Sequence, residues 1–226
     1  ASLGEGCSPV LYKDKLVILR DNRGQSTIQV LNAKNGETIW VKNRNTRNGW
    51  ATPAVVEHEG KVQIITTASR PEVGNRKTPG KVISYDLENG NIIWEYSGLT
   101  DNAIPCPIVE NGVAYCMTGY LGFSLVAVPI SGKGEQSKNI LWKRELGTRY
   151  VPSPVLYDGL LYVTQSYQAF LSCVDEKTGK VLMERTRLPG LSNVYASLVG
   201  AGNHIYVVGR YGKTAVLKRT GKFDLV

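Results

Sequence analysis

Short apolar runs alternate with polar turns along the whole chain, and the order of these runs repeats. The first unit opens with Ser8-Pro9 before an apolar pair at 10–11, continues with apolar runs at 16–19 and 27–31, and closes at 38–40. Runs of this length, rich in β-branched residues and bounded by turn residues, are typical of strands. No stretch has the period of a helix. The pattern therefore predicts a unit of four antiparallel strands.

The same order of strands and turns returns along the rest of the sequence and fades only in the last unit. Repeats of about this length, each with four short strands and a glycine turn, are typical of propeller blades. We therefore predict an all-β fold, a β-propeller of four-stranded antiparallel blades, in which all 226 residues form one propeller. The predicted blades are residues 7–43, 51–97, 105–146, 152–186 and 195–226.

The first and last units are incomplete in the same strand. The tryptophan that the repeat places about four residues before Leu3 lies upstream of residue 1, and the chain stops at Val226 as its last strand begins. We expect the chain to be part of a larger ring of seven or eight blades. The alternative is a closed ring of five blades, in which residues 223–226 and 1–3 complete one outer strand and remove the open sheet edges.

The turn before the last strand of a unit has the most specific pattern. It begins with Asn or Asp, passes through Gly, and ends in a tryptophan four residues later, as in Asp86, Gly90 and Trp94. The first side chain can accept backbone N–H bonds, the glycine reaches positive φ, and the indole offers a large surface to the next blade. We therefore predict a structural role in blade docking for three tryptophans: Trp40, Trp94 and Trp142.

This repeat resembles the tryptophan-docking repeat of the quinoprotein, or PQQ-like, β-propellers. The resemblance covers essentially the whole chain, but Leu182 stands at the tryptophan position of the fourth unit. Two kinds of protein share this fold. The PQQ-dependent dehydrogenases hold the quinone with a calcium ion, a catalytic Asp and a disulfide between adjacent cysteines. The lipoprotein scaffold of the outer-membrane β-barrel assembly machinery, by contrast, binds other proteins.

The four cysteines of the chain include no adjacent pair and no CxxC motif. No quinone-binding or catalytic residue is therefore carried over, and no metal site is expected. Cys106 and Cys116 flank a hairpin and could face each other, although buried free thiols are the simpler alternative. Catalytic sequence motifs are also missing.

The resemblance thus implies a non-enzymatic binding or scaffolding module for protein partners, with no cofactor, in the periplasm or exported. The main alternative is a fragment of a PQQ-dependent oxidoreductase, which would require PQQ and calcium. A third possibility is a closed, sugar-binding ring of the lectin type. No run approaches the roughly 18 consecutive apolar residues of a membrane-spanning helix.

Charge indicates where a partner would bind. The chain carries 27 Lys and Arg against 19 Asp and Glu, a net charge of +8. In a four-stranded blade, the loops between blades and the loops joining second to third strands lie on one face, which we call the loop face. Most of the excess of positive charge falls on the loop face, and the residues counted there include Arg44 and Arg187. Lysines on the opposite face are interspersed with acidic residues.

Arginines and aromatic residues together are typical of interaction hot spots, and a basic face attracts an anionic partner or ligand. A solvated basic surface is the alternative. Nucleic acid is not favoured, because no nucleic-acid-binding motif accompanies the charge. The candidate binding residues on the loop face are Arg47, Asn48, Trp50, Arg70, Arg76, Arg149, Tyr150, Tyr195 and Arg210.

Overall fold

The computed structural model describes residues 4–72, 77–145, 151–165 and 167–226. Within these residues the chain forms strands, turns and loops, with no helix. The strands form five sheets, and apart from one short crossing strand each sheet is built from successive strands that pair antiparallel. The predicted all-β propeller architecture is confirmed.

The strands of the first three blades share the same order from the inner to the outer edge. The first blade contains β1 (Val10–Tyr12), β2 (Lys15–Arg20), β3 (Ser26–Asn32) and β4 (Thr38–Arg44). The second contains β5 (Ala54–His58), β6 (Lys61–Ala68), β7 (Gly80–Asp86) and β8 (Ile92–Leu99). The third contains β9 (Ile108–Glu110), β10 (Val113–Thr118), β11 (Ser124–Pro129) and β13 (Trp142–Arg144).

The last two blades continue this order. The fourth contains β14 (Val155–Tyr157), β15 (Leu160–Gln165), β16 (Phe170–Asp175) and β17 (Val181–Arg187). The fifth contains β18 (Val199–Ala201), β19 (His204–Val208) and β20 (Thr214–Lys218). Its outer edge is extended by an isolated bridge between Leu217 and Leu225, so residues near the C-terminus add to this blade as the start of a fourth strand.

One strand departs from the simple meander. Between β11 and β13 the third blade sends out β12 (Gly134–Glu135), which pairs in parallel with β8 of the second blade. The backbone N–H of Gln136 donates to the carbonyl of Glu95, and the Ser137 hydroxyl donates to the carbonyl of Ser97. The outer edge of the second blade is therefore covered by its neighbour, as is common for sheet edges.

Apolar side chains fill the space between neighbouring blades. Four buried clusters join blades one and two, two and three, three and four, and four and five. Trp40 and Trp142 belong to these clusters, and each donates its indole N–H to a backbone carbonyl of the next blade at 2.8 Å, at Leu87 and Glu176 respectively. Both indoles therefore lie between neighbouring blades.

Trp94 docks differently, although it is fully buried between the second and third blades. Its indole N–H donates to Oε1 of Gln63 at 3.0 Å, and Nε2 of Gln63 donates to the carbonyl of Ile130 at 3.0 Å. The Ser84 hydroxyl also donates to Oε1 of Gln63. An amide side chain therefore relays the contact that the other two tryptophans make directly.

The Ser-Pro and Thr-Pro pairs that open the units also have a structural role. The backbone N–H of Ser8 donates to the Thr52 hydroxyl, and that of Ser153 donates to the Ser197 hydroxyl, both at 3.1 Å. The N–H of Cys106 likewise donates to Ser153 Oγ at 3.0 Å. Hydroxyls before the inner strands thus connect neighbouring blades close to the centre of the propeller.

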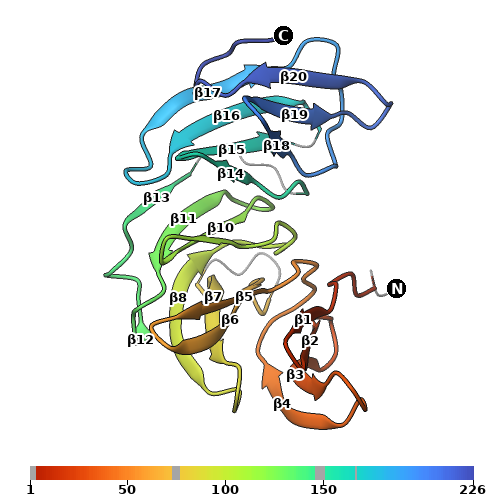
Figure 1. Cartoon of the computed structure of the whole chain (residues 1–226), viewed down its shortest axis with the longest axis vertical. Helices are drawn as coiled ribbons and strands as arrows, with labels where there is room; N and C mark the ends of the chain where they lie inside the picture. The colour runs from red at the N-terminus through yellow and green to blue at the C-terminus, as the bar shows by residue number, and fades with distance from the viewer. Residues whose placement is uncertain (1–3, 73–76, 146–150, 166) are drawn as a thin grey trace.

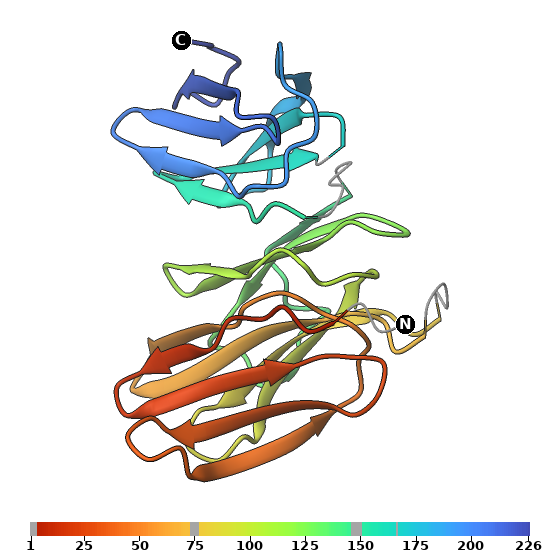
Figure 2. The same cartoon turned by 90° about the vertical axis from the view of Figure 1, so that its right-hand side faces the viewer.

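The blades follow one another along an open arc, with the first and fifth at its two ends (Figure 1). Figure 2 shows the same succession from the side, with the first two sheets at the bottom and the last two at the top. Among the described residues no buried cluster joins the fifth blade to the first. The alternative of a closed five-bladed ring is therefore not what the structure shows; residues 1–3, part of that alternative, lie outside the described residues.

Candidate functional site

Loops of the first two blades and the connections that follow them meet on the loop face and enclose a small cavity. Arg23 comes from the β2–β3 loop, Arg47 and Asn48 from the connection after β4, and Arg70 from the loop after β6. Asp101, in the connection to the third blade, completes the polar lining. The cavity has a volume of about 40 Å³. Four of the predicted binding residues are thus brought together here: Arg47, Asn48, Trp50 and Arg70.

Hydrogen bonds hold these loops in place. The Ser69 hydroxyl donates to the carbonyl of Asn48 at 2.8 Å and accepts the N–H of Ala103 at 2.9 Å. Nη1 of Arg70 lies 3.4 Å from Oδ2 of Asp101, and both side chains are largely buried. Burial raises the pKa of the Asp101 carboxyl, while Arg70 and Arg47 oppose that rise. The lining of the cavity is therefore well ordered and predominantly cationic.

Trp50 combines a structural with a surface position. Its backbone N–H donates to the carbonyl of Ala103, and its half-buried ring packs on Gly6, where a Cβ atom would come within 2.7 Å of Cδ1. The ring also borders the small cavity. Trp50 therefore fixes the N-terminal segment against the loops and forms one wall of the cavity.

Arg44, counted from the sequence as part of the basic face, is instead fully buried. It forms a bidentate pair with Asp21 of its own blade, at 2.8 and 3.1 Å, and Nη1 donates to Thr66 Oγ1 and to the Tyr85 hydroxyl. Nη2 also donates to the Thr67 carbonyl. The loop-face expectation was wrong for this residue because its charge is neutralised inside the interface between the first two blades.

A second group of predicted residues meets between the fourth and fifth blades. The guanidinium of Arg210 lies 5.3 Å from the centre of the Tyr195 ring, and Tyr195 meets Tyr167 edge to face at 5.9 Å. A hydrogen bond with Tyr167 raises the pKa of Tyr195. Arg210, Tyr167 and the neighbouring Tyr211 are exposed, Tyr211 to 73%. This Arg210–Tyr195–Tyr167 stack presents a cation and aromatic rings to solvent.

Near it, two arginines flank one phenylalanine. Arg185 and Arg187 of β17 lie 5.3 and 5.9 Å from the ring centre of Phe170. The pairing of β16 and β17 is interrupted by a register shift between Leu171 and Cys173, and Arg185 has a φ of 41°. β-Bulges of this kind re-aim side chains. Among the described residues neither arginine forms an ion pair.

The structure therefore separates the predicted binding residues into two groups in different blades. Arg76, Arg149 and Tyr150 lie outside the described residues, and their predicted role stays a prediction. Sequence reasoning missed Arg23, although its place between a second and a third strand could have revealed it. It also missed Arg185, because a bulge leaves no signal in the sequence.

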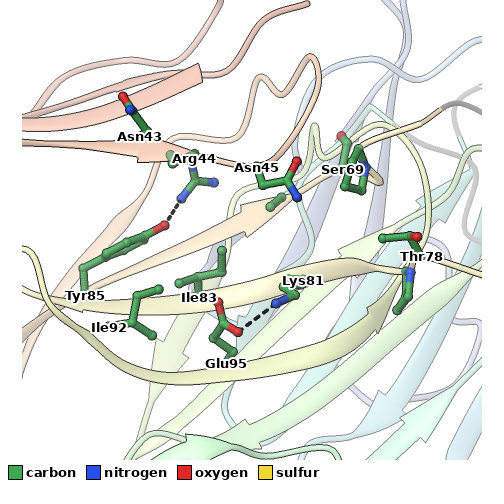
Figure 3. A pocket seen from close by; sticks show the side chains of 13 residues that line it. Asn43, Arg44, Asn45, Ser69, Thr78, Lys81, Ile83, Tyr85, Ile92 and Glu95 are labelled. Carbon is green, nitrogen blue, oxygen red and sulfur yellow. Dashed lines mark hydrogen bonds and ion pairs between the residues drawn. The ribbon is translucent and has the colours of Figure 1, made fainter. Parts of the chain in front are cut away.

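A larger cavity of about 370 Å³ opens between the first and second blades (Figure 3). Asn43 and Asn45 line it from the end of β4, while Ile83, Lys81 and Glu95 line it from the second blade. Lys81 and Glu95 form an ion pair at 2.8 Å across adjacent strands. This cavity thus has a mixed polar and apolar lining, and it shares Ser69 with the smaller one.

The residues described do not fit the quinone and calcium site of the dehydrogenase alternative. All four cysteines are free, and no group of three or more His, Cys, Asp or Glu side chains in the described part of the chain could hold a metal ion. Cys106 and Cys116 do not pair. Burial raises the pKa of the Cys7 and Cys173 thiols to about 12, so both stay protonated at neutral pH.

The fold defines the chain as a β-propeller, and comparison with known proteins identifies its family. A family model described as outer membrane protein assembly factor BamB matches residues 1–185. The chain belongs to this PQQ-like family of β-propellers.

Individual relatives support the fold. The structure of BamB from Moraxella catarrhalis superposes with a TM-score of 0.64 at 17% identity, covering 98% of this chain and 62% of that one. Quinohemoprotein alcohol dehydrogenase from Comamonas testosteroni superposes with a TM-score of 0.66 at 15% identity, covering 97% and 42%. Tetrathionate hydrolase from Acidithiobacillus ferrooxidans is 23% identical over 171 residues, which are 67% of this chain and 31% of the hydrolase. The chain therefore spans less than two thirds of each of these relatives.

Proposed function

We propose that this chain is a non-enzymatic binding and scaffolding module whose loop face contacts protein partners. The observation that carries the proposal is the Arg210–Tyr195–Tyr167 stack, joined by the two arginines on Phe170. Arginine and aromatic side chains are enriched where protein interfaces gain most of their affinity. Cations that lack an acidic neighbour also favour a partner that supplies acidic groups.

Family membership supports a proposal for the partners and for the cellular location of this chain. The family description names an assembly factor for outer membrane proteins, so we propose partners among the proteins of outer-membrane assembly and a periplasmic location. Among the described residues there is no helix of the length and apolar character needed to cross a membrane. An anionic group on the partner, matched to the loop face, is part of the same proposal.

Site-specific photo-crosslinking in the source cells tests the proposal. A benzophenone amino acid replaces the exposed Tyr211 on the loop face, and the control replaces Lys177 in the exposed β16–β17 turn on the opposite face. We expect a discrete adduct with an envelope protein from the Tyr211 position and none from Lys177. The adduct should be lost with Arg187→Glu and Arg210→Glu together and retained with Lys180→Glu.

Two results would overturn the proposal. One is the same adduct from both positions, because this would place the contact away from the loop face. The other is an adduct from Tyr211 that survives the double charge reversal, since the arginines would then make no contribution to binding. Circular dichroism of each variant establishes that the propeller is still folded.

A further inference from the structure

Two residues that line the small loop-face cavity each have a buried hydrogen-bond donor without an acceptor among the described residues. Asn48 is 6% exposed and Arg70 is 8% exposed, yet Nδ2 of Asn48 and Nε of Arg70 form no hydrogen bond with any residue that the structure describes. Buried polar groups in proteins nearly always have a partner, and an unmet donor needs an explanation, such as a ligand or ordered water. Both residues line the same cavity, so their unmet donors point to one missing acceptor.

The charges around these donors indicate an anion. Three arginines line the cavity, Arg23, Arg47 and Arg70, against the single carboxylate of Asp101. Among the described residues, the Asp101 carboxylate receives a hydrogen bond only from Nη1 of Arg70, at 3.4 Å, so it leaves most of the guanidinium donors available. Guanidinium groups bind carboxylates through pairs of parallel N–H bonds.

The size of the cavity limits the ligand. A cavity needs a volume of about 10–15 Å³ to hold one water molecule. The 40 Å³ present here therefore has room for the oxygens of one carboxylate group, and none for a ring system.

We propose that the cavity lined by Arg47, Asn48 and Arg70 binds one carboxylate group. The carboxylate comes from an acidic side chain or the C-terminus of a protein partner, and this part of the inference rests on the proposed function. The guanidinium groups supply the charge, and the amide of Asn48 selects for an oxygen acceptor. The half-buried ring of Trp50 shields one side of the site from water and reports on its occupancy.

NMR titration of the ¹⁵N-labelled chain tests the site with defined probes. Sodium acetate is added while the signals of the Trp50 indole N–H, the Asn48 side-chain amide and the Arg70 Nε–H are followed, with sodium chloride at equal ionic strength as the reference. We expect saturable shifts with acetate at millimolar concentrations and only small, linear shifts with chloride. Equal responses to the two salts would overturn the proposal.

Two blocked peptides then distinguish the sources of the carboxylate. Acetyl-Gly-Glu-Gly-amide offers a side-chain carboxylate, and acetyl-Gly-Gly-Gly offers only a C-terminal one. We expect at least one of them to shift the same three signals at lower concentration than acetate does. If acetate saturates the site and neither peptide reaches it, the site takes small carboxylic acids, and the assignment to a protein partner is wrong.

A substitution within the cavity gives an independent check. Asn48→Asp places a carboxylate of the chain itself beside Arg47 and Arg70, so we expect loss of the acetate response and a higher melting temperature. The matched control is Asn45→Asp, which adds the same charge at an exposed position nearby and should keep the response.

Arg47→Gln keeps the test decisive if Asn48→Asp does not fold. Arg47 is half-buried, and its replacement removes one cation from the lining. We expect acetate to bind at least fivefold more weakly. Unchanged binding in this variant, or an acetate response that persists in folded Asn48→Asp, would overturn the proposal. Either failure leaves the crosslinking at Tyr211 interpretable, because that residue lies in the fifth blade.

Discussion

The ring of each directly docked tryptophan packs closely against a glycine of the next blade. A Cβ atom on Gly90 would lie 2.7 Å from the Trp40 ring, and one on Gly179 would lie 2.5 Å from the Trp142 ring. In the fourth blade Leu182 takes the tryptophan position, and its Cδ1 faces Gly221 in the same way. These glycines are therefore needed twice, for positive φ and for the close approach of a large side chain.

Gly90→Ala and Gly36→Ala separate these two requirements. Both glycines have positive φ, 70° and 77°, in equivalent turns, but the space around Gly36 is open within 4 Å. Gly36→Ala should lower the free energy of unfolding by about 1–2 kcal/mol, the cost of a left-handed alanine. Gly90→Ala should cost about 1–3 kcal/mol more, because the methyl group displaces Trp40. Urea unfolding measures the free energy of unfolding of both variants, and equal losses would show that the close packing of Trp40 on Gly90 is unimportant.

Acid should weaken the turn that receives Trp142. Hydrogen bonds from the Thr178 hydroxyl and backbone N–H lower the pKa of Asp175. A carboxyl whose pKa is lower in the folded state stabilises the protein above its unfolded pKa of about 3.9, and this contribution is lost as the pH falls through the folded value.

The variant Asp175→Ala shows this dependence directly. It should be less stable than the original chain at pH 6, and the difference in free energy of unfolding should shrink as the pH falls from about 4 toward 2, since protonation removes the advantage of the carboxylate. Urea unfolding across this pH range measures it. A difference that stays constant with pH would contradict the role of the ionised carboxylate.

Among whole elements, the first two blades are joined by the buried Arg44 as well as by apolar packing. Arg44 is the last residue of β4. Its guanidinium donates hydrogen bonds to Asp21 in its own blade and to Thr66 and Tyr85 on β6 and β7 of the second blade. Burial raises the pKa of the Asp21 carboxyl, and the paired guanidinium opposes that rise. The pair is therefore important mainly because either charge, buried in this interface without its partner, would strongly destabilise the fold.

Arg44→Met should reduce the free energy of unfolding by about 3–5 kcal/mol, because it leaves the Asp21 carboxylate buried without its partner. Adding Asp21→Asn to this variant should recover part of the loss. The exposed pair of Arg20 and Glu5 serves as the control, since an ion pair in contact with water contributes little and Arg20→Met should cost far less than Arg44→Met. Thermal and urea unfolding compare the variants. Similar losses for Arg44→Met and Arg20→Met would contradict this account.

The sequence was informative about elements that depend on local patterning. Strand positions and the turn chemistry at Asn32, Asp86 and Asp175 follow from short apolar runs and fixed spacing, and the structure confirms them. Each of these features is set by residues close together in the chain.

Features that depend on contacts between blades could not be predicted. The crossing of β12 to β8, the Gln63 relay and the burial of Arg44 each require residues that are far apart in sequence. The same holds for the candidate site. Arg47, Asn48, Trp50 and Arg70 were predicted from their loops, but their convergence on one cavity with Asp101 needed the structure.

At the scale of the whole molecule, binding chemistry is distributed unevenly over the loop face. The first two blades and the connections that follow them contribute the small cationic cavity, and the fourth and fifth blades contribute the arginine–aromatic contacts. A large partner that spans the arc could use both sites, with the stacks supplying contact area and the cavity taking one acidic group. Such a division suits a scaffold, in which several weak contacts along one face add to a stable complex.

Titration calorimetry with PQQ in the presence of calcium chloride tests most directly whether this propeller is a scaffold or part of a quinoprotein enzyme. The described residues offer neither adjacent cysteines nor a cluster of metal-binding side chains, and we propose no cofactor. The account therefore predicts no saturable heat when PQQ is added to the folded chain. Saturable binding at micromolar concentrations would contradict it and would group the chain by function with the quinoprotein dehydrogenases.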